Sequence, residues 1–347
     1  MPTLRLLICC LFATLVFATL KAQDPQFSQF YANPLYQNPA FAGSSLMNRV
    51  VLNYRYQWPS LQANYQTFSA SYDRFFQKIN SGLGVQVLND LQGFGRLNSL
   101  QASVSYAYQL KLSDKFSARA GLQAAYVQRN IGYFGLTFGS QFTGNGFDTD
   151  PSSSGEDLST AVKRYFDASA GVLLFTDQFF LGISAHHLTL PSQSFITRFG
   201  DRLPLKIQVQ TGWKIPLDDK TKFGLAENVT GQERSLTPAI LYKQQGLAQQ
   251  LDVGLYLTLE PLVVGAWYRG LPVFPNKFVG INNHDAVIAL VGMKFQGLSV
   301  GYSYDFTISQ LGASSGGAHE IAIIYEWLKV KKGRTPKSMK FTPCPKF

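Results

Sequence analysis

The sequence predicts an all-β protein, a transmembrane antiparallel up-and-down β-barrel of fourteen strands in a bacterial outer membrane. Three observations predict it: an export signal at the start, a composition rich in aromatic residues (14%) and poor in charged ones (15%), and long segments in which apolar and polar residues alternate. Ordinary soluble domains carry about 25% charged residues. No later stretch reaches the roughly 18 continuous apolar residues of a spanning helix, so strands must cross the membrane.

Residues 1–22 are predicted to be a signal peptide. A short basic start precedes the almost wholly apolar run from Leu6 to Leu20, and the small residue Ala22 follows Lys21 at the expected cleavage point. The alternative is a membrane anchor, which needs about 20 apolar residues, and this run is shorter.

The segment 23–47 is the next element, and its composition predicts neither helix nor paired strand. It is rich in aromatic residues and contains two Asn-Pro steps, Asn33-Pro34 and Asn38-Pro39, which favour turns and extended backbone. We expect an ordered periplasmic or plug-like segment that packs its aromatic side chains against or inside the base of the barrel.

The barrel is predicted to span 48–328, because apolar and polar residues alternate there with the period of a strand that faces lipid on one side and a lumen on the other. In the segment 97–110, for example, Val104, Tyr106 and Tyr108 alternate with Ser105 and Ala107. Trp58, Trp213 and Trp327 fall at segment ends, as an interfacial girdle requires. The predicted strands are 48–57, 65–74, 80–90, 97–110, 116–130, 165–175, 178–190, 205–214, 232–243, 248–258, 261–270, 285–295, 299–307 and 319–328.

A stretch at 223–229 would make a fifteenth strand, but parity argues against it. Bacterial single-chain barrels have even strand numbers, short periplasmic turns and longer outer loops. With fourteen strands, the connections 131–164, 191–204, 271–284 and 308–318 fall outside and the short ones at 113–115, 176–177 and 296–298 fall inside. The alternative fold is a soluble β-sandwich or barrel, whose solvent face usually carries more Lys and Glu than these strands do.

The net charge of +10 is local to the ends of the chain. The tail 329–347 holds seven basic residues and no acid, and Arg5 and Lys21 lie in the signal, which leaves +1 for the body. Nucleic acid binding is therefore not indicated. The basic, Pro-containing tail is predicted to be periplasmic, where it would suit an acidic partner or a peptidoglycan-associated protein; a merely solvated tail is the alternative.

Catalytic, metal and cofactor sites are not indicated. Only Cys344 remains after export, so neither a disulfide nor a Cys-based metal site can form. His186 and His187 are adjacent in a predicted strand and should point to opposite faces. Ser314 or Ser315 near His319 is the local candidate for an outer-membrane hydrolase, although Ser and Gly there are ordinary turn residues.

A calcium loop is the other candidate binding site, since Asp148, Asp150, Glu156 and Asp157 lie close together in sequence. The segment lacks the alternating ligands, central Gly and closing Glu of an EF-hand, so a solvated outer loop is the simpler interpretation. No GxxxxGK[ST] or GxGxxG phosphate cradle follows a strand. We expect a protein that is not an enzyme and holds no cofactor or metal.

Two carboxylates in alternating segments, Asp305 and Glu320, are expected to face the lumen, and a buried charge needs a partner. The candidate partners are the arginines at alternating positions of other strands, and the sequence does not say which of them pair. They are Arg49, Arg55, Arg74, Arg119 and Arg269.

Three motifs stand out: FSQFYANPLYQNPAFAG at 27–43, GYSYDFTIS at 301–309 and SGGAHEI at 315–321. At these residues the chain resembles the PorP/SprF family of type IX secretion system membrane proteins of the Bacteroidetes, in order and spacing across nearly the whole mature chain. The residues that carry the resemblance, in structural or interaction roles, are Phe27, Ser28, Gln29, Tyr31, Asn38, Pro39, Ala40, Gly43, Tyr302, Ser303, Tyr304, Asp305, Gly317, His319 and Glu320.

The resemblance implies an outer-membrane barrel that works in type IX secretion and, in some members, gliding motility. Its expected partners are outer-membrane lipid, the periplasmic secretion ring or peptidoglycan-associated proteins, and secreted cargo or a surface adhesin. The alternative function is a diffusion porin or a channel for hydrophobic substrates, because a polar lumen by itself does not reveal whether the barrel is open.

Overall fold

The computed structural model describes residues 24–93, 97–132, 142–143, 146–147, 162–195, 202–217, 233–270 and 284–327. The predicted signal peptide, the basic tail, the stretch 223–229 and the calcium-loop candidate at 148–157 lie outside the described residues. Within the described part, no helix is long and apolar enough to cross a membrane.

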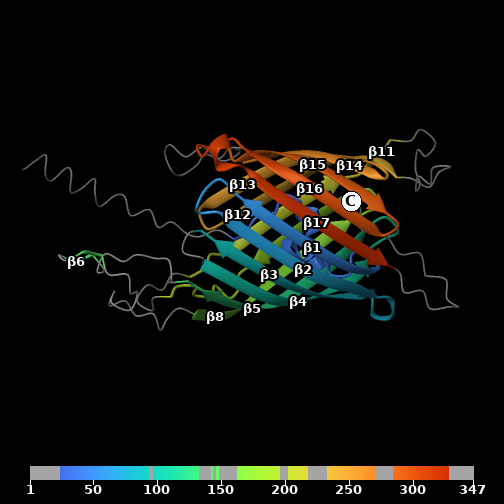
Figure 1. Cartoon of the computed structure of the whole chain (residues 1–347). Helices are drawn as coiled ribbons and strands as arrows, with labels where there is room; N and C mark the ends of the chain where they lie inside the picture. Colours follow the sequence, from blue (N-terminus) through green and yellow to red (C-terminus); the bar gives the residue numbers. More distant parts are fainter. Residues whose placement is uncertain are drawn as a thin grey trace, which may run out of the picture.

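Fourteen long strands of the described chain form one antiparallel sheet that closes on itself (Figure 1). Each strand pairs with the next along the chain, and β1 pairs with β17 over ten residue pairs, from Asn48 opposite Trp327 to Gln57 opposite Ala318. The strands are β1 Asn48–Gln57, β2 Tyr65–Phe76, β3 Ser81–Gln92, β4 Leu97–Lys111, β5 Ser117–Asn130, β8 Val162–Phe175, β9 Phe179–His186, β10 Lys206–Trp213, β12 Arg234–Gln245, β13 Ala248–Leu259, β14 Leu262–Arg269, β15 Ala286–Phe295, β16 Leu298–Thr307 and β17 Ala318–Trp327.

Three shorter strands complete the described set. β11 (Ile215–Pro216) follows β10 and pairs with the same neighbour, β12, so it adds no further strand to the barrel wall. β6 (Phe142–Thr143) and β7 (Gly146–Phe147) pair only with each other. The predicted fourteen-strand antiparallel barrel is confirmed, and the predicted strand ends agree with the observed ones to within four residues.

The cylinder has two distinct ends, which follow from the strand order. At the turn end, strands are joined by short connections such as 176–178, 260–261 and 296–297, and β1 begins and β17 ends there. At the loop end, the longer connections join β9 to β10 and β14 to β15. The long connection from β10 to β12 joins strand ends at the turn end, and the two-residue connection 246–247 lies at the loop end, so the expected separation of short from long connections is incomplete.

The barrel wall is apolar outside and polar inside. On β4, Val104 is 55% exposed, whereas the next residue, Ser105, is 1% exposed and faces the lumen. Outward residues of the wall include many large apolar side chains, and the buried residues include many Ser, Gln, Asn, Asp and Arg. A soluble protein would have the opposite arrangement, so this wall is built for lipid outside and polar groups inside.

Candidate functional site

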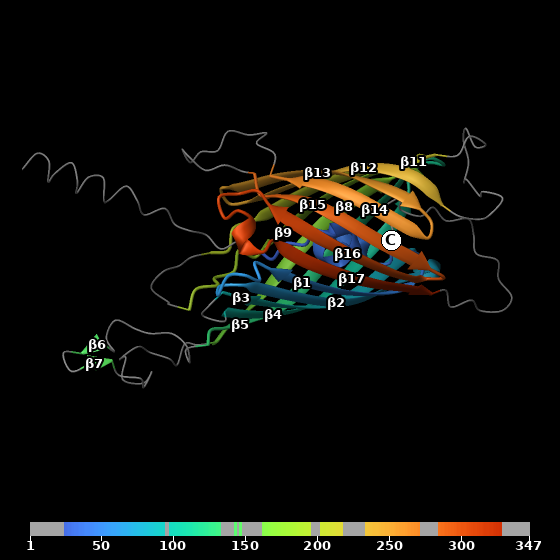
Figure 2. The same ribbon diagram turned by 45° about the horizontal axis from the view of Figure 1, so that its top comes forward.

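Residues 24–47, which we call the lumen segment, fill the inside of the barrel. They form three short helical pieces, η1 (Phe30–Ala32), α2 (Pro34–Gln37) and η2 (Pro39–Phe41), seen as the blue coiled ribbon within the cylinder in Figure 2. Each Asn-Pro step starts a piece, because Pro has no N–H to lose at a first helical position. The Asn38 side chain caps η2 by accepting from the Ala40 N–H at 2.9 Å.

The lumen segment runs along the barrel from the loop end to the turn end. Asp24 contacts His187, Lys206 and Gln245, which lie where β9, β10 and β12 reach the loop end. Gly43, near the other end of the segment, donates its N–H to Asp73 on β2 at 2.7 Å, close to the turn end. The chain then enters β1, so the segment lines almost the full length of the lumen.

A buried cluster of charges holds the segment at Ser28. The Ser28 hydroxyl donates to Asp305 at 2.7 Å and accepts from Arg55 at 2.6 Å and Arg269 at 2.8 Å. Arg55 also pairs with Asp305 at 2.8 Å and Glu320 at 3.2 Å, and Arg269 pairs with Asp305 at 2.7 Å. One donor and two lone pairs are all that a hydroxyl offers, so charged side chains from β1, β14 and β16 satisfy the Ser28 hydroxyl completely.

Gln29 extends the same cluster through the backbone. The N–H groups of Ser28 and Gln29 donate to the two carboxylate oxygens of Glu320, at 2.6 Å and 2.9 Å. The Gln29 side chain donates to the Glu320 backbone oxygen at 2.9 Å and to Ser303 at 3.2 Å. Two backbone N–H groups and the Arg55 guanidinium thus surround the buried Glu320 carboxylate with donors.

The candidate arginines divide into different roles. Arg55 and Arg269 are the partners of Asp305 and Glu320. Arg49 pairs instead with Asp73 at 2.8 Å, and Arg74 lies over the Phe76 ring. Arg119 donates to two backbone oxygens of the lumen segment, those of Ala40 and Ala42.

Aromatic packing holds the middle of the segment against β12 to β15. Phe30 meets Trp267 edge-on at 4.8 Å between ring centres, and Tyr31 meets Tyr256 at 4.4 Å. Around them lies an apolar sector of the lumen, which includes Leu241. Such T-shaped contacts add about 0.5–1.5 kcal/mol each to the burial of the rings.

On the opposite side, glycines let the segment approach the wall backbone. A Cβ at Gly82 would lie 1.8 Å from the Ala42 oxygen, and one at Gly121 would lie 2.4 Å from the Ala40 nitrogen. A Cβ at Gly171 would lie 2.0 Å from the Asn38 side-chain oxygen. Gly82, Gly121 and Gly171 therefore form a groove, the glycine groove, that holds residues 38–43 of the lumen segment.

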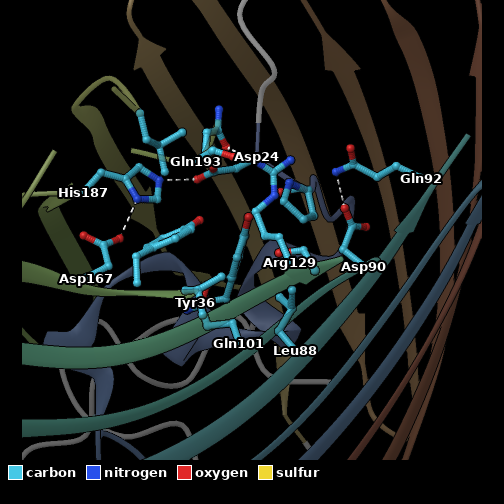
Figure 3. Close-up of a pocket in the computed structure, with 15 residues that line it drawn as sticks. Asp24, Tyr36, Leu88, Asp90, Gln92, Gln101, Arg129, Asp167, His187 and Gln193 are labelled. Atoms are coloured by element: carbon cyan, nitrogen blue, oxygen red, sulfur yellow. Dashed lines mark hydrogen bonds and ion pairs between the residues drawn. The ribbon is translucent and has the colours of Figure 1, made fainter. Parts of the chain in front are cut away.

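The loop end of the segment is fixed by an ion-pair chain at the mouth (Figure 3). His187 lies between two carboxylates, with Nδ1 2.6 Å from Asp167 and Nε2 2.8 Å from Asp24. Lys206 adds a contact to Asp24 at 3.0 Å. Burial alone would lower the pKa of His187, but the charges and hydrogen bonds of Asp24 and Asp167 outweigh it and raise the pKa to about 9. Both ring nitrogens therefore donate, and the imidazole is charged.

A small cavity adjoins this chain, lined by residues of the segment, of the wall and of the connection after β9. Its volume is about 60 Å³, room for a few water molecules at roughly 10–15 Å³ each. Arg129 crosses it to Gln193, donating to the side-chain oxygen at 2.7 Å (Figure 3). Gln193, in the connection after β9, is thereby held against Arg129 of β5 at the mouth.

The prediction that His186 and His187 point to opposite faces is wrong. β9 ends at His186, four residues before the predicted end, and His187 adopts φ 62°, a left-handed conformation that breaks the alternation. Both side chains are therefore buried in the lumen. His186 contacts the Gln37 backbone oxygen at 3.2 Å and Ser169 at 3.1 Å.

The hydrolase candidates do not come together. Ser315 donates to the Gly312 oxygen at 2.9 Å and Ser314 to the Leu311 oxygen at 3.1 Å. The ring of His319 instead contacts the Tyr302 hydroxyl at 2.8 Å on the outer face of the barrel. No group of three metal-ligating side chains is assembled within the described residues.

The motif residues other than Gly317 fall into two sets. One set lies in the lumen segment or contacts it. The other, formed by the rings of Tyr302, Tyr304 and His319, lies on β16 and β17 away from the segment, where Tyr304 and His319 are 4.9 Å apart between ring centres. Gly317, with φ 66°, makes the turn that leads into β17.

Sequence reasoning missed three parts of this site: the Asp24–His187–Asp167 chain, the glycine groove, and the pairing of Arg269 with Asp252 at 3.8 Å. The groove had a signal, because Gly82 and Gly84 occupy successive inward positions of one strand. The ion-pair chain had none, since Asp24 is more than 140 residues from its partners along the chain and no shared pattern links their segments.

Comparisons with known proteins agree with this architecture. The family model described as "Type IX secretion system membrane protein PorP/SprF" matches residues 19–325. The crystal structure of the Ralstonia pickettii toluene transporter TbuX is similar with a TM-score of 0.51 and 9% identity, over 84% of this chain and 92% of that one. A Pseudomonas aeruginosa FadL homologue matches with a TM-score of 0.42 and 12% identity, over 83% and 92%. At such identities the likeness to TbuX shows the barrel fold alone. No curated protein sequence matches the chain.

Proposed function

The chain belongs to the PorP/SprF family of type IX secretion system membrane proteins, and from that premise we propose that it serves secretion as an outer-membrane scaffold rather than as a conduit. It acts through protein–protein contacts in cargo secretion or surface anchoring and, as the family resemblance implies for some members, in gliding motility. It catalyses no reaction and needs no cofactor.

One observation carries the proposal: the lumen is occupied from end to end by residues 24–47. Buried ion pairs, aromatic contacts and backbone contacts hold this segment to strands on every side. Passage of a polypeptide or a sizeable solute would require breaking all of them together. The surfaces left for partners are the two ends of the barrel and its outer wall.

The two ends of the barrel would bind different partners. With the loop end outside, as in other bacterial barrels, the connections such as 308–317 face secreted cargo or a surface adhesin. The turn end then faces the periplasm, where the secretion ring or peptidoglycan-associated proteins would bind. Outer-membrane lipid surrounds the apolar wall.

Conductance and secretion together test this function. The purified full-length protein is placed in a planar bilayer, with an open porin as positive control, and a strain lacking the gene is assayed for surface display of type IX cargo. We expect no steady conductance from the protein and loss of cargo display in the strain. Steady conductance with intact secretion would instead identify a porin or a hydrophobic-substrate channel.

Cysteine labelling tests the orientation. In a Cys344→Ser background, Ser314→Cys places a thiol at the loop end and Ser113→Cys places one at the turn end, both at exposed positions. A membrane-impermeant maleimide should label the first in intact cells and the second only after the outer membrane is opened. The reverse pattern would invert the assignment of partners to ends.

A further inference from the structure

The seam between β1 and β17 joins the two ends of the barrel chain. Arg55 on β1 lies directly opposite Glu320 on β17, and the two are 265 residues apart in sequence. Pairing of strands so distant in sequence has a high entropic cost, because the intervening chain must be brought together before any stabilising contact forms. β1 and β17 lie side by side in Figure 1.

The lumen segment binds both sides of this seam at one place. The backbone N–H groups of Ser28 and Gln29 hold the Glu320 carboxylate of β17, while the Ser28 hydroxyl accepts from Arg55 of β1. The same hydroxyl reaches Asp305 on β16 and Arg269 on β14. The late strands of the chain thus meet the first one through two residues of the lumen segment.

Residues 37–43 of the segment contact strands that come early in the chain, whereas Asp24, Phe30 and Tyr31 also contact strands from β10 to β14. Gly43 binds Asp73 of β2, Ala40 and Ala42 bind Arg119 of β5, and Gln37 binds Ser184 of β9. These contacts need no strand after β9. Residues 37–43 can therefore be seated on the first half of the sheet before the last strands arrive, which keeps Ser28 and Gln29 inside the forming barrel.

The contacts also distinguish the correct register from its nearest error. A slip of one residue would turn Glu320 from the lumen to the outer face, because side chains alternate along a strand. Ser28 and Gln29 would then lose both carboxylate bonds, and a charge would face lipid. The observed register satisfies the segment, and a register shifted by one residue does not.

We propose that Ser28 and Gln29 are an intramolecular closing clamp, which captures Glu320 and Asp305 of the last strands and sets the register of β17 against β1 as the barrel closes. This function is separate from secretion. It explains why an aromatic and polar segment precedes the first strand and why its Ser-Gln pair faces the Asp and Glu of β16 and β17.

Refolding kinetics test the clamp. The denatured mature protein is diluted from urea into detergent micelles or lipid vesicles, and formation of the compact, heat-modifiable form is followed on unheated gels. Ser28→Ala is compared with Ser184→Ala, which also removes one buried serine hydroxyl that binds the lumen segment, but away from the seam. Ser28→Ala should slow closure by about tenfold, because it loses contacts to charged groups in the closing step. Ser184→Ala should close at nearly the wild-type rate.

A second pair covers the case in which Ser28→Ala does not fold. Gln29→Ala removes the bonds to Ser303 and the Glu320 backbone, and Gln86→Ala removes a comparable bond from β3 to Asn33 of the segment. Slower closure in the seam variant of either pair supports the clamp. Equal folding rates within both pairs, with any loss appearing only as faster unfolding, would show that Ser28 and Gln29 stabilise the finished barrel without directing its closure.

Discussion

Residues 24–29 and residues 38–43 belong to the same lumen segment, yet they are held in the barrel differently. The first part is fixed by charge: Asp24 contacts His187 and Lys206, and Ser28 lies among Arg55, Arg269 and two carboxylates. The second part also hydrogen-bonds to Arg119 and Asp73 through its backbone, but it differs from the first in lying directly on strand backbone, where Gly82, Gly121 and Gly171 leave room.

The difference teaches how a polar lumen can be filled stably. A buried charge pair is sensitive to the loss of either partner, because the remaining charge is then buried without compensation. Backbone contact at glycines fails in the opposite way, through addition of atoms rather than their removal. Substitutions that remove a charge should therefore disrupt the part of the segment nearer the loop end, residues 24–29, which we call the loop half. Substitutions that add volume should disrupt residues 38–43, the turn half.

The largest effect is expected for Arg55→Leu, since Glu320 then loses its guanidinium partner inside the lumen. The free energy of unfolding should fall by about 3–5 kcal/mol, measured from tryptophan fluorescence in urea with the protein folded in detergent. Arg74→Leu is the control, because Arg74 contacts the Phe76 ring at the turn end; it should cost under about 1 kcal/mol. Equal losses in the two variants would contradict a charge-held loop half.

Gly82→Ala should displace the turn half of the lumen segment. Its Cβ would lie 1.8 Å from the Ala42 oxygen, so the lumen segment must move, at a cost of up to about 3 kcal/mol. Leu83→Val, at the next and outward-facing position, should change stability little. Limited proteolysis offers an independent readout, because a displaced segment should be cut sooner than in the wild-type protein. An undisturbed Gly82→Ala barrel would argue that the groove is looser than its geometry indicates.

Protonation of His187 should make the stability of the loop half depend on pH. Its pKa rises from an ordinary value near 6.5 to about 9 in the folded protein. A raised pKa contributes stability that is fully present below about pH 6.5 and is lost as the pH rises through 9. The contribution is roughly 3 kcal/mol, because a pKa difference of one corresponds to 1.36 kcal/mol. Unfolding free energies measured from pH 6 to pH 10 should decline across that window in the wild type and more weakly in His187→Gln, where Asp24, Asp167 and Lys206 remain. Parallel profiles would remove His187 from the stabilising chain.

The smallest effect is expected for Asn38→Ala in the turn half. It removes the cap of η2 and two bonds to the strand oxygens of Val172 and Ile183, both at 3.2 Å. A loss of about 1 kcal/mol is expected. Asn38→Ser keeps a capping oxygen and should recover part of that loss in the same urea titration. No recovery would assign the effect to the strand contacts rather than to the cap.

Much of the barrel could be read from the sequence, and the reasons are local. The alternation along 97–110 fixed both the strand and its outward face, because a period of two is a property of extended backbone itself. Parity and loop lengths then gave fourteen strands. β9 shows where this reasoning stops: nothing in the alternation indicates that His187 turns into the lumen to meet Asp24 and Asp167.

The amino-acid sequence by itself determined the wall of this protein, its apolar outside and polar inside, and the expectation that Asp305 and Glu320 need cationic partners. Only the tertiary structure decided that Arg55 and Arg269 supply them, that Ser28 stands among all four, and that residues 24–47 fill the lumen from end to end. The physical reason is that strand patterns depend on neighbours along the chain. The lumen contacts depend on which side chains closure brings together across more than 200 residues of sequence.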